Sequence, residues 1–137
     1  MNAIGFTGTR NGMTMTQKHI LGDGLFWLRS FAEEFHHGDC VGADEEAASL
    51  AKGFGYQIVG HPPDERGARA FFQSDISLPE KPYLERNHAI VDATQILIAC
   101  PFEVEEVLRS GTWATIRYAN QSNKPIVVIS PNGTLRL

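Results

Sequence analysis

Short apolar runs alternate with helical patterns along this chain, and this alternation restricts the fold more than any other feature of the sequence. Residues Gln95–Cys100 are almost continuously apolar, which is typical of a strand buried on both faces of a sheet. Shorter runs predict four further strands at Ala3–Thr7, Glu34–His37, Tyr56–Gly60 and Pro125–Ile129. The alternation predicts an α/β fold, a three-layer Rossmann-like domain with a mostly parallel sheet of about five strands.

Helical spacing of apolar residues predicts the elements that cover this sheet. The first helix is expected to be capped by Thr16 and to bury a face that carries Leu21 and Leu25. Three more helices are expected to begin near Asp44, Tyr83 and Ser110. No period is evident from 64 to 82, where we expect a long loop with one short helix around 68–72.

Length and composition fit a single domain that spans residues 1–137. No apolar run approaches the roughly 20 residues that a membrane span needs, so no membrane partner is expected. The net charge of −4 disfavours nucleic acid, whose broad binding depends on Lys and Arg neutralising phosphates. Cys40 and Cys100 make no disulfide framework and no secretory signal opens the chain, so the expected location is the cytoplasm.

Three turns follow predicted strands, and ligands of parallel α/β sheets bind outside the carboxyl ends of the strands. In the first turn, glycine lets backbone N–H groups approach an anion, and Arg10 is able to bind phosphate bidentately. In the second, Asp39 or Asp44 would bind ribose hydroxyls, unless Asp44 only caps a helix. The third opens a helix whose free N–H groups form a natural phosphate seat, unless Ser110 is only its N-cap. The candidate ligand-binding residues in these turns are Gly8, Thr9, Arg10, Gly38, Asp39, Gly42, Asp44, Ser110, Gly111 and Thr112.

Other clusters are better explained by ordinary structure. His36, His37, Asp39 and Cys40 contain metal-ligand chemistry, but no second ligand group stands at a recognisable spacing, so no metal site is expected. Cys100 fits a small buried hydrophobe. The acidic run at 103–106 fits a solvated face. The aromatic residues Phe71, Phe72 and Tyr83 fit either base stacking or core packing.

Several short stretches together resemble the SLOG superfamily, which includes the DprA and Lonely Guy proteins. The stretches are Gly8-Thr9-Arg10, the run from His37 to Asp44, Arg86-Asn87 before Val91-Asp92-Ala93, the run from Leu97 to Pro101, and Ser110 to Thr115. They follow the family's order and cover nearly the whole chain. The resemblance implies a Rossmann-like fold that binds nucleotides or nucleotide-derived ligands, usually in a homo-oligomer. It adds Arg86, Asn87 and Thr115 to the candidate ligand-binding residues.

Lonely Guy enzymes cleave the N-glycosidic bond of nucleoside 5′-monophosphates, and their motif is Pro-Gly-Gly-x-Gly-Thr-x-x-Glu with a preceding arginine. Arg86 matches that arginine, and Gly111 and Thr112 match the Gly-Thr pair. Thr115 stands where the glutamate belongs, and a threonine supplies no charge to an oxocarbenium-like centre. Glu103 or Glu106 in the preceding loop are the candidate substitutes.

The sequence therefore supports three hypotheses. The first is a protein that binds a nucleotide-type small molecule, as a sensor, a sequestering protein or a processing protein, without a further cofactor. The second is a phosphoribohydrolase in which Arg86 and Glu103 are catalytic. The third is a DprA-like module that binds single-stranded DNA. The aromatic residues Trp27, Trp113, Phe71 and Phe72 exceed the needs of a small core, so a homodimer is also expected.

Overall fold

The computed structural model describes residues 2–137, which form one mixed sheet of seven strands with helices on both faces. The helices are α1 (Met15–Trp27), α2 (Ala43–Gly53), α3 (Tyr83–Asp92) and α4 (Gly111–Gln121), with 3-10 turns at Leu28–Ser30 and Arg66–Ala68. The strands are β1 (Ala3–Gly8), β2 (Glu34–His37), β3 (Gln57–Gly60), β4 (Ile76–Ser77), β5 (Ile96–Cys100), β6 (Ile126–Ile129) and β7 (Leu135–Arg136).

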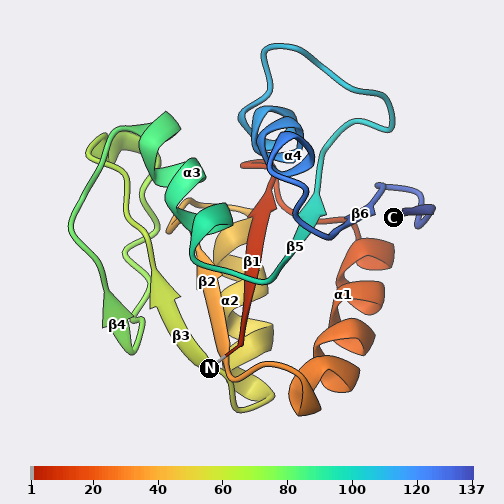
Figure 1. The fold of residues 1–137 in the computed structure, drawn as a ribbon, viewed down its shortest axis with the longest axis horizontal. Helices are drawn as coiled ribbons and strands as arrows, with labels where there is room; N and C mark the ends of the chain where they lie inside the picture. Colours follow the sequence, from red (N-terminus) through yellow and green to blue (C-terminus); the bar gives the residue numbers. More distant parts are fainter. Residues whose placement is uncertain (1) are drawn as a thin grey trace.

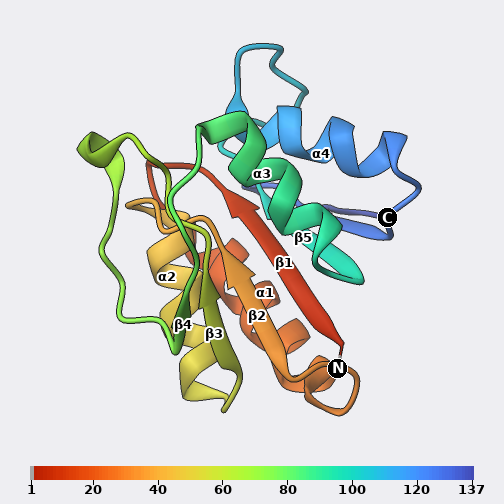
Figure 2. The same cartoon turned by 60° about the vertical axis from the view of Figure 1, so that its left-hand side comes forward.

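The strand order is β4-β3-β2-β1-β5-β6-β7, and every neighbouring pair is parallel except β6 with β7. Helices α1 and α2 pack on one face of the sheet, and α3 and α4 pack on the other (Figures 1 and 2). The chain leaves β1 toward one edge of the sheet and returns to the other side of β1 with β5. The order reverses between these two strands, so the ends of β1 and β5 are where an open α/β sheet is expected to bind its ligand.

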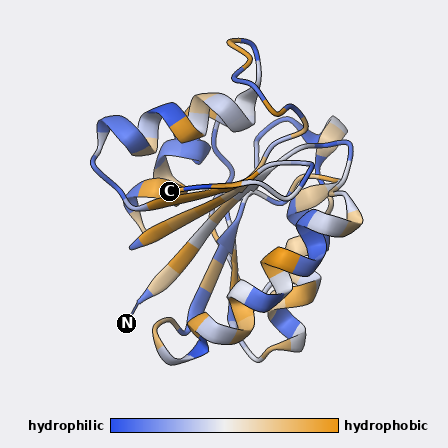
Figure 3. Ribbon diagram, turned by 90° about the vertical axis from the view of Figure 1, so that its right-hand side faces the viewer, coloured by the Kyte–Doolittle hydropathy of each residue, from blue (hydrophilic) through white to orange (hydrophobic). Residues whose placement is uncertain are grey.

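Two apolar clusters lie between the layers. One packs α1 and α2 against β1, β2 and β3, and the other packs α3 and α4 against β5 and β6. Figure 3 shows hydrophobic residues concentrated in the strands, whereas the helices contain both hydrophobic and hydrophilic residues. Trp113 and Phe72 pack within these layers, whereas Trp27 and Phe71 are exposed. Among residues 2–137, no helix has both the length and the apolar character needed to cross a membrane.

Three features of the fold differ from the predictions made from the sequence. Two edge strands, β4 and β7, were not expected, because each contains only two residues and has no readable alternation. The segment predicted as a helix near 68–72 contains only a 3-10 turn at Arg66–Ala68. Helix α1 is capped by Thr14 and not by Thr16, because Thr14 and Gln17 form a reciprocal capping box.

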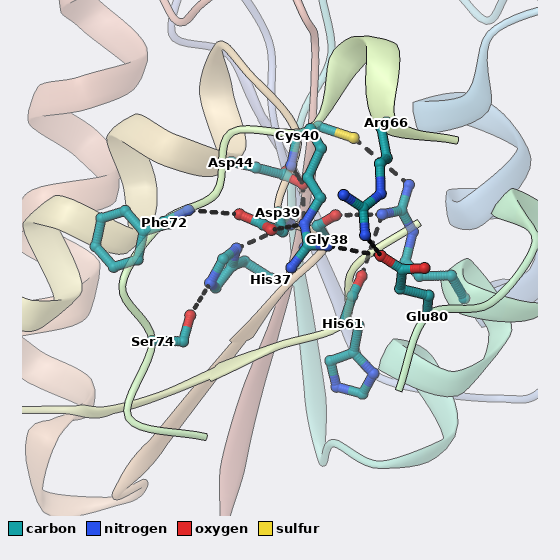
Figure 4. A network of polar contacts seen from close by, with 12 residues as sticks. His37, Gly38, Asp39, Cys40, Asp44, His61, Arg66, Phe72, Ser74 and Glu80 are labelled. Atoms are coloured by element: carbon teal, nitrogen blue, oxygen red, sulfur yellow. Dashed lines mark hydrogen bonds and ion pairs between the residues drawn. The ribbon is translucent and has the colours of Figure 1, made fainter. Parts of the chain in front are cut away.

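Buried histidines join β2 and β3 to the loop that follows (Figure 4). His37 accepts a hydrogen bond from the backbone N–H of Asp39 at Nδ1, at 2.9 Å, so its Nε2 carries the proton that meets Ser74 Oγ. Beside it, His36 Nδ1 lies 2.8 Å from His61 Nε2. Burial, the largest cause, lowers the pKa of His37 to about 4 and that of His61 to about 3. Both rings are therefore held neutral near pH 7.

We expect the Thr14→Ala variant to lose about 1–2 kcal/mol of unfolding free energy, because its hydroxyl caps α1 and also donates to the Pro131 carbonyl. Thr16→Ala removes an exposed hydroxyl from the first turn of the helix and should cost under about 0.5 kcal/mol. Urea unfolding of both variants measures the difference. Equal losses for the two would contradict the assignment of the cap.

Stability should also fall on acidification. Because the folded-state pKa of His37 lies below its unfolded value of 6.5, the unfolded chain binds more protons between about pH 6.5 and 4. The contribution of uncharged His37 to the free energy of unfolding is complete above pH 6.5. It is lost as the pH falls toward 4, by up to about 1.4 kcal/mol per pH unit. Urea unfolding across this range should give a shallower slope for His37→Gln than for the wild type. The exposed His19, changed in the same way, should leave the slope unaltered.

Candidate functional site

A cleft of about 460 Å³ lies at the carboxyl ends of β1 and β5, between the loop after β1 and the first turns of α3 and α4. The backbone N–H of Thr9 donates to the Cys100 carbonyl at 3.2 Å and holds the two loops together at this point. The sequence-predicted residues that line the cleft are Gly8, Thr9, Arg10, Gly38, Asp44, Arg86, Asn87, Glu103, Ser110, Gly111 and Thr112. Three turns far apart in the sequence thus contribute to one cavity.

The loop after β1 packs tightly against α2 and presents Arg10 to the cleft. A side chain at Gly8 would lie 2.6 Å from Ala43 Cβ, so the backbone there passes directly over the helix. Gly42, with φ +87°, supports the same crossing, because a Cβ there would lie 2.3 Å from the Arg10 carbonyl oxygen. Gly42 therefore shapes the loop but does not line the cleft, contrary to the expectation of a ligand contact.

The start of α4 forms the opposite wall. Ser110 is its N-cap, and Ser110 Oγ accepts from the backbone N–H of Trp113 at 3.2 Å. The N–H groups of Gly111 and Thr112 belong to the first turn, which has no carbonyl partners within the helix. No heavy atom lies within 4 Å of the position that a Cβ of Gly111 would take, so this turn faces open space. The wall is suited to an anion.

The side chain of Arg86 reaches beneath the cleft and is almost fully buried. One terminal nitrogen donates to the carbonyl groups of Gly38 and His61, and the other lies 3.6 Å from Cys40 Sγ. Nε donates to Asn87 Oδ1 at 2.8 Å. Every nitrogen of the guanidinium thus has a partner within the protein. Arg86 links the ends of β2 and β3 to α3.

Asp44 is the anionic partner of this buried arginine. Its Oδ2 accepts from the backbone N–H groups of Gly38, at 3.0 Å, and Cys40, at 3.4 Å. Burial raises the pKa of Asp44 to about 6, although Arg86 and the two N–H groups act in the opposite direction. The side chain does not cap α2, whose N-cap is Gly42, because it turns back toward the preceding loop instead.

Asp39 and Thr115 do not line the cleft, contrary to the prediction. The Asp39 carboxylate accepts from Arg69 Nε at 2.8 Å and from the backbone N–H of Phe72 at 2.9 Å, so it anchors the loop after β3 (Figure 4). Thr115 is buried on α4, where its hydroxyl donates to the Gly111 carbonyl at 2.9 Å. Sequence alone did not show that Asp39 has partners in the loop after β3, or that Thr115 bonds to a carbonyl of its own helix.

His37, Asp39 and Ser74 are the residue types of a catalytic triad, but their hydrogen bonds run in the wrong direction for one. Because His37 Nδ1 accepts from a backbone N–H, its Nε2 donates to Ser74 Oγ and does not take a proton from it. Burial raises the pKa of Cys100 to about 12, which makes its thiol a poor nucleophile. Within residues 2–137, no group of three His, Cys, Asp or Glu side chains is placed to hold a metal ion.

Several residues of the cleft were absent from the predicted set: Phe6, Thr7, Asn11, Cys40, Tyr83, Ile90, Phe102 and Arg109. Tyr83 was considered only as a base-stacking or core residue. Its ring lies against two guanidinium groups, with Arg10 Cζ 5.1 Å and Arg86 Cζ 5.2 Å from the ring centroid. Arg109 was not singled out, because an arginine in a loop without a readable pattern resembles any solvated residue. Its position directly before the N-cap of α4 was the available clue.

Comparisons with known proteins identify related folds. No protein-family model and no curated protein matches the chain. The molybdenum cofactor binding protein from the phototrophic bacterium Rippkaea orientalis matches with a TM-score of 0.72 and 20% identity, over 94% of this chain and 76% of that one. The molybdenum cofactor carrier protein from Chlamydomonas reinhardtii matches with a TM-score of 0.65 and 22% identity, over 93% and 75%.

A third match is DNA processing protein A from Helicobacter pylori, whose structure is described for its binding of single-stranded DNA. Its TM-score is 0.67 and its identity 20%, over 93% of this chain and 64% of that one. The present chain therefore spans less than two thirds of that protein's length. At these identities the likeness concerns the fold alone, and the chain shares with these proteins the Rossmann-like α/β fold that the sequence predicted.

Proposed function

We propose that the cleft binds a phosphorylated small molecule of the nucleotide type. The observation that carries this proposal is the gathering of the free N–H groups at the start of α4 with Arg10 and Arg109 around one cavity. Amide groups at a helix start and guanidinium groups are the donors that proteins use most for phosphate. Their convergence in a cavity supports a ligand whose phosphate lies at this end of the sheet.

The charges that line the cleft support the same proposal. Arg86 and Asp44 are buried groups of opposite charge, and the charge of Arg86 lowers the pKa of Asp44 against the effect of burial. Arg10 and Arg109 form no ion pair within residues 2–137. Arg10 Cζ lies over the Tyr83 ring, 5.1 Å from its centroid, and this contact does not use the N–H groups with which a guanidinium binds phosphate. Apart from the buried Asp44, Glu103 is the only acidic residue that lines the cleft.

The similar structures widen the range of ligands to test. Two of them are named for the molybdenum cofactor, so a cofactor of that class is tested beside the nucleotides. The sequence argument against nucleic acid stays a prediction, because DNA processing protein A from Helicobacter pylori, with the same fold, is described as binding single-stranded DNA.

A phosphoribohydrolase is the second candidate, and the position of Glu103 favours it. Glu103 lines the cleft, where its Oε1 accepts from Trp113 Nε1 at 3.1 Å, so the carboxylate is fixed close to the start of α4. A carboxylate so placed is suited to stabilise positive charge at an anomeric carbon. Arg86 supports the cleft in this mechanism rather than acting on the substrate, because its nitrogens are bonded within the protein.

A thermal-shift panel tests the binding proposal. Nucleoside mono-, di- and triphosphates, NAD, ADP-ribose, cyclic nucleotides and a phosphorylated pterin are each added at millimolar concentration. At least one should raise the melting temperature, because a ligand that binds only the folded chain stabilises it. Arg10→Ala should weaken that ligand about tenfold or more, as expected when a charged hydrogen-bond partner of phosphate is lost. The exposed Arg29, changed to alanine, is the control and should leave binding unchanged. No shift with any ligand would contradict the proposal.

Chromatography after incubation with AMP, CMP and GMP tests the enzymatic alternative. If Glu103 acts at the anomeric carbon, free base is released by the wild type and its release falls by at least about 100-fold in Glu103→Gln. Glu105→Gln, a change in the same loop that leaves the cleft intact, should retain the activity. Ligand binding without release of base would leave the binding function and remove the hydrolase.

A further inference from the structure

The hydroxyl of Tyr83 has no hydrogen-bond partner. Within residues 2–137 it is the one buried side-chain nitrogen or oxygen without a partner. Tyr83 is the first residue of α3 and lines the cleft. An unpaired buried hydroxyl is unfavourable for folding, and native proteins keep such groups rarely, so a partner from outside the chain is the straightforward explanation. The position of the residue makes the ligand that partner.

The ring of Tyr83 is held in place from both sides of the cleft. Arg10 comes from the loop after β1 and Arg86 from the next turn of α3, and both guanidinium groups lie within about 5 Å of the ring centroid. Arg86 is fixed by its own hydrogen bonds, whereas Arg10 is exposed. Arg10 is therefore free to shift across the ring when its N–H groups engage a phosphate, which gives the ligand access to the hydroxyl.

Asn87 extends this wall of the cleft. It follows Tyr83 by four residues on α3, so the two side chains lie one above the other on the same helix face. Asn87 Oδ1 accepts from Arg86 Nε, which fixes the amide and leaves its two N–H donors for a ligand. The wall thus combines a hydroxyl that donates and accepts with an amide that donates.

The carboxylates first assigned to the ribose are engaged elsewhere. Asp39 lies outside the cleft and binds Arg69, while Asp44 accepts from two backbone N–H groups. The wall formed by α3 is beside the proposed phosphate seat on α4, and α3 and α4 pack together on one face of the sheet. In a nucleotide, the group joined directly to the phosphate is the sugar.

We propose that Tyr83, assisted by Asn87, binds a sugar hydroxyl of the ligand and selects ribonucleotides over their deoxy counterparts. This inference rests on the proposed function, since it takes the phosphate to lie at the start of α4 beside Arg10. It names Tyr83 as a specificity-determining residue.

The Tyr83→Phe variant tests the inference, because it removes the hydroxyl and keeps the ring on which Arg10 lies. Calorimetry measures the binding of AMP, CMP, GMP and UMP and of the 2′-deoxy and 3′-deoxy form of each. Tyr83→Phe should weaken the ribonucleotide about three- to tenfold, the usual effect of one lost hydrogen bond, and should leave one of the two deoxy forms unchanged. Tyr118→Phe makes the same chemical change at a hydroxyl that donates to Asp92 outside the cleft, and should not alter binding.

A second measurement on the same variant uses no ligand. Removing an unpaired buried hydroxyl relieves its desolvation, so Tyr83→Phe should raise the melting temperature by about 2–5 °C while it weakens binding. Unchanged ribonucleotide affinity would overturn the inference and leave the proposed function standing. An equal loss for the ribonucleotide and both deoxy forms would overturn the sugar assignment and move the contact to the base. If no nucleotide binds the wild type, the proposed function fails together with the inference.

Discussion

The buried guanidinium of Arg86 is the interaction on which the ligand-binding end of this molecule depends. A charged group in the interior is tolerated only when its donors are satisfied and an opposite charge is near. Here the carbonyl groups of Gly38 and His61, the Asn87 side chain and the Asp44 carboxylate meet those demands. Because those partners come from the ends of β2 and β3 and from α3, one side chain fixes three segments relative to one another. The floor of the cleft is thereby rigid, while the cations at its rim are left for a ligand.

The different roles of the three arginines in the cleft could not be predicted from residue type. Arg10, Arg86 and Arg109 have the same chemistry, and a family motif had singled out Arg86 for a direct role. Burial decides otherwise: a guanidinium with its nitrogens bonded to protein acts as a support, and the more exposed Arg10 and Arg109 keep their hydrogen-bonding edges. The same holds for the acidic side chains. Asp39 anchors a loop, whereas Glu103, first regarded as part of a solvated acidic run, faces the cavity.

The sequence predicted the fold well because apolar runs report burial directly. Gln95–Cys100 had to be a central strand, and the glycine-bearing turns after the strands identified the edge where a cleft is found. It failed where a residue's partner lies far away along the chain. Nothing near Asp39 indicated that its carboxylate binds Arg69 and the backbone N–H of Phe72. Nothing near Tyr83 indicated that its ring also lies against Arg10. Two-residue strands at the sheet edges were missed because they depend on pairing and not on any pattern of their own.

The pairing of β1 with β5 has a consequence for how the molecule assembles. It pairs Ile4 with Ile96, so the two central strands of the sheet form their hydrogen bonds only after about 90 intervening residues have been brought together. Closing a loop of that length is slow relative to local hairpins and helices, since its entropy must be overcome before the contact is gained. The half that contains β1, β2 and β3 is contiguous in sequence and is free to organise first. Because the cavity lies at the seam between that half and β5, we expect it to be absent from any early folding intermediate. A nascent chain would then be unable to capture its ligand until synthesis has passed the fourth helix.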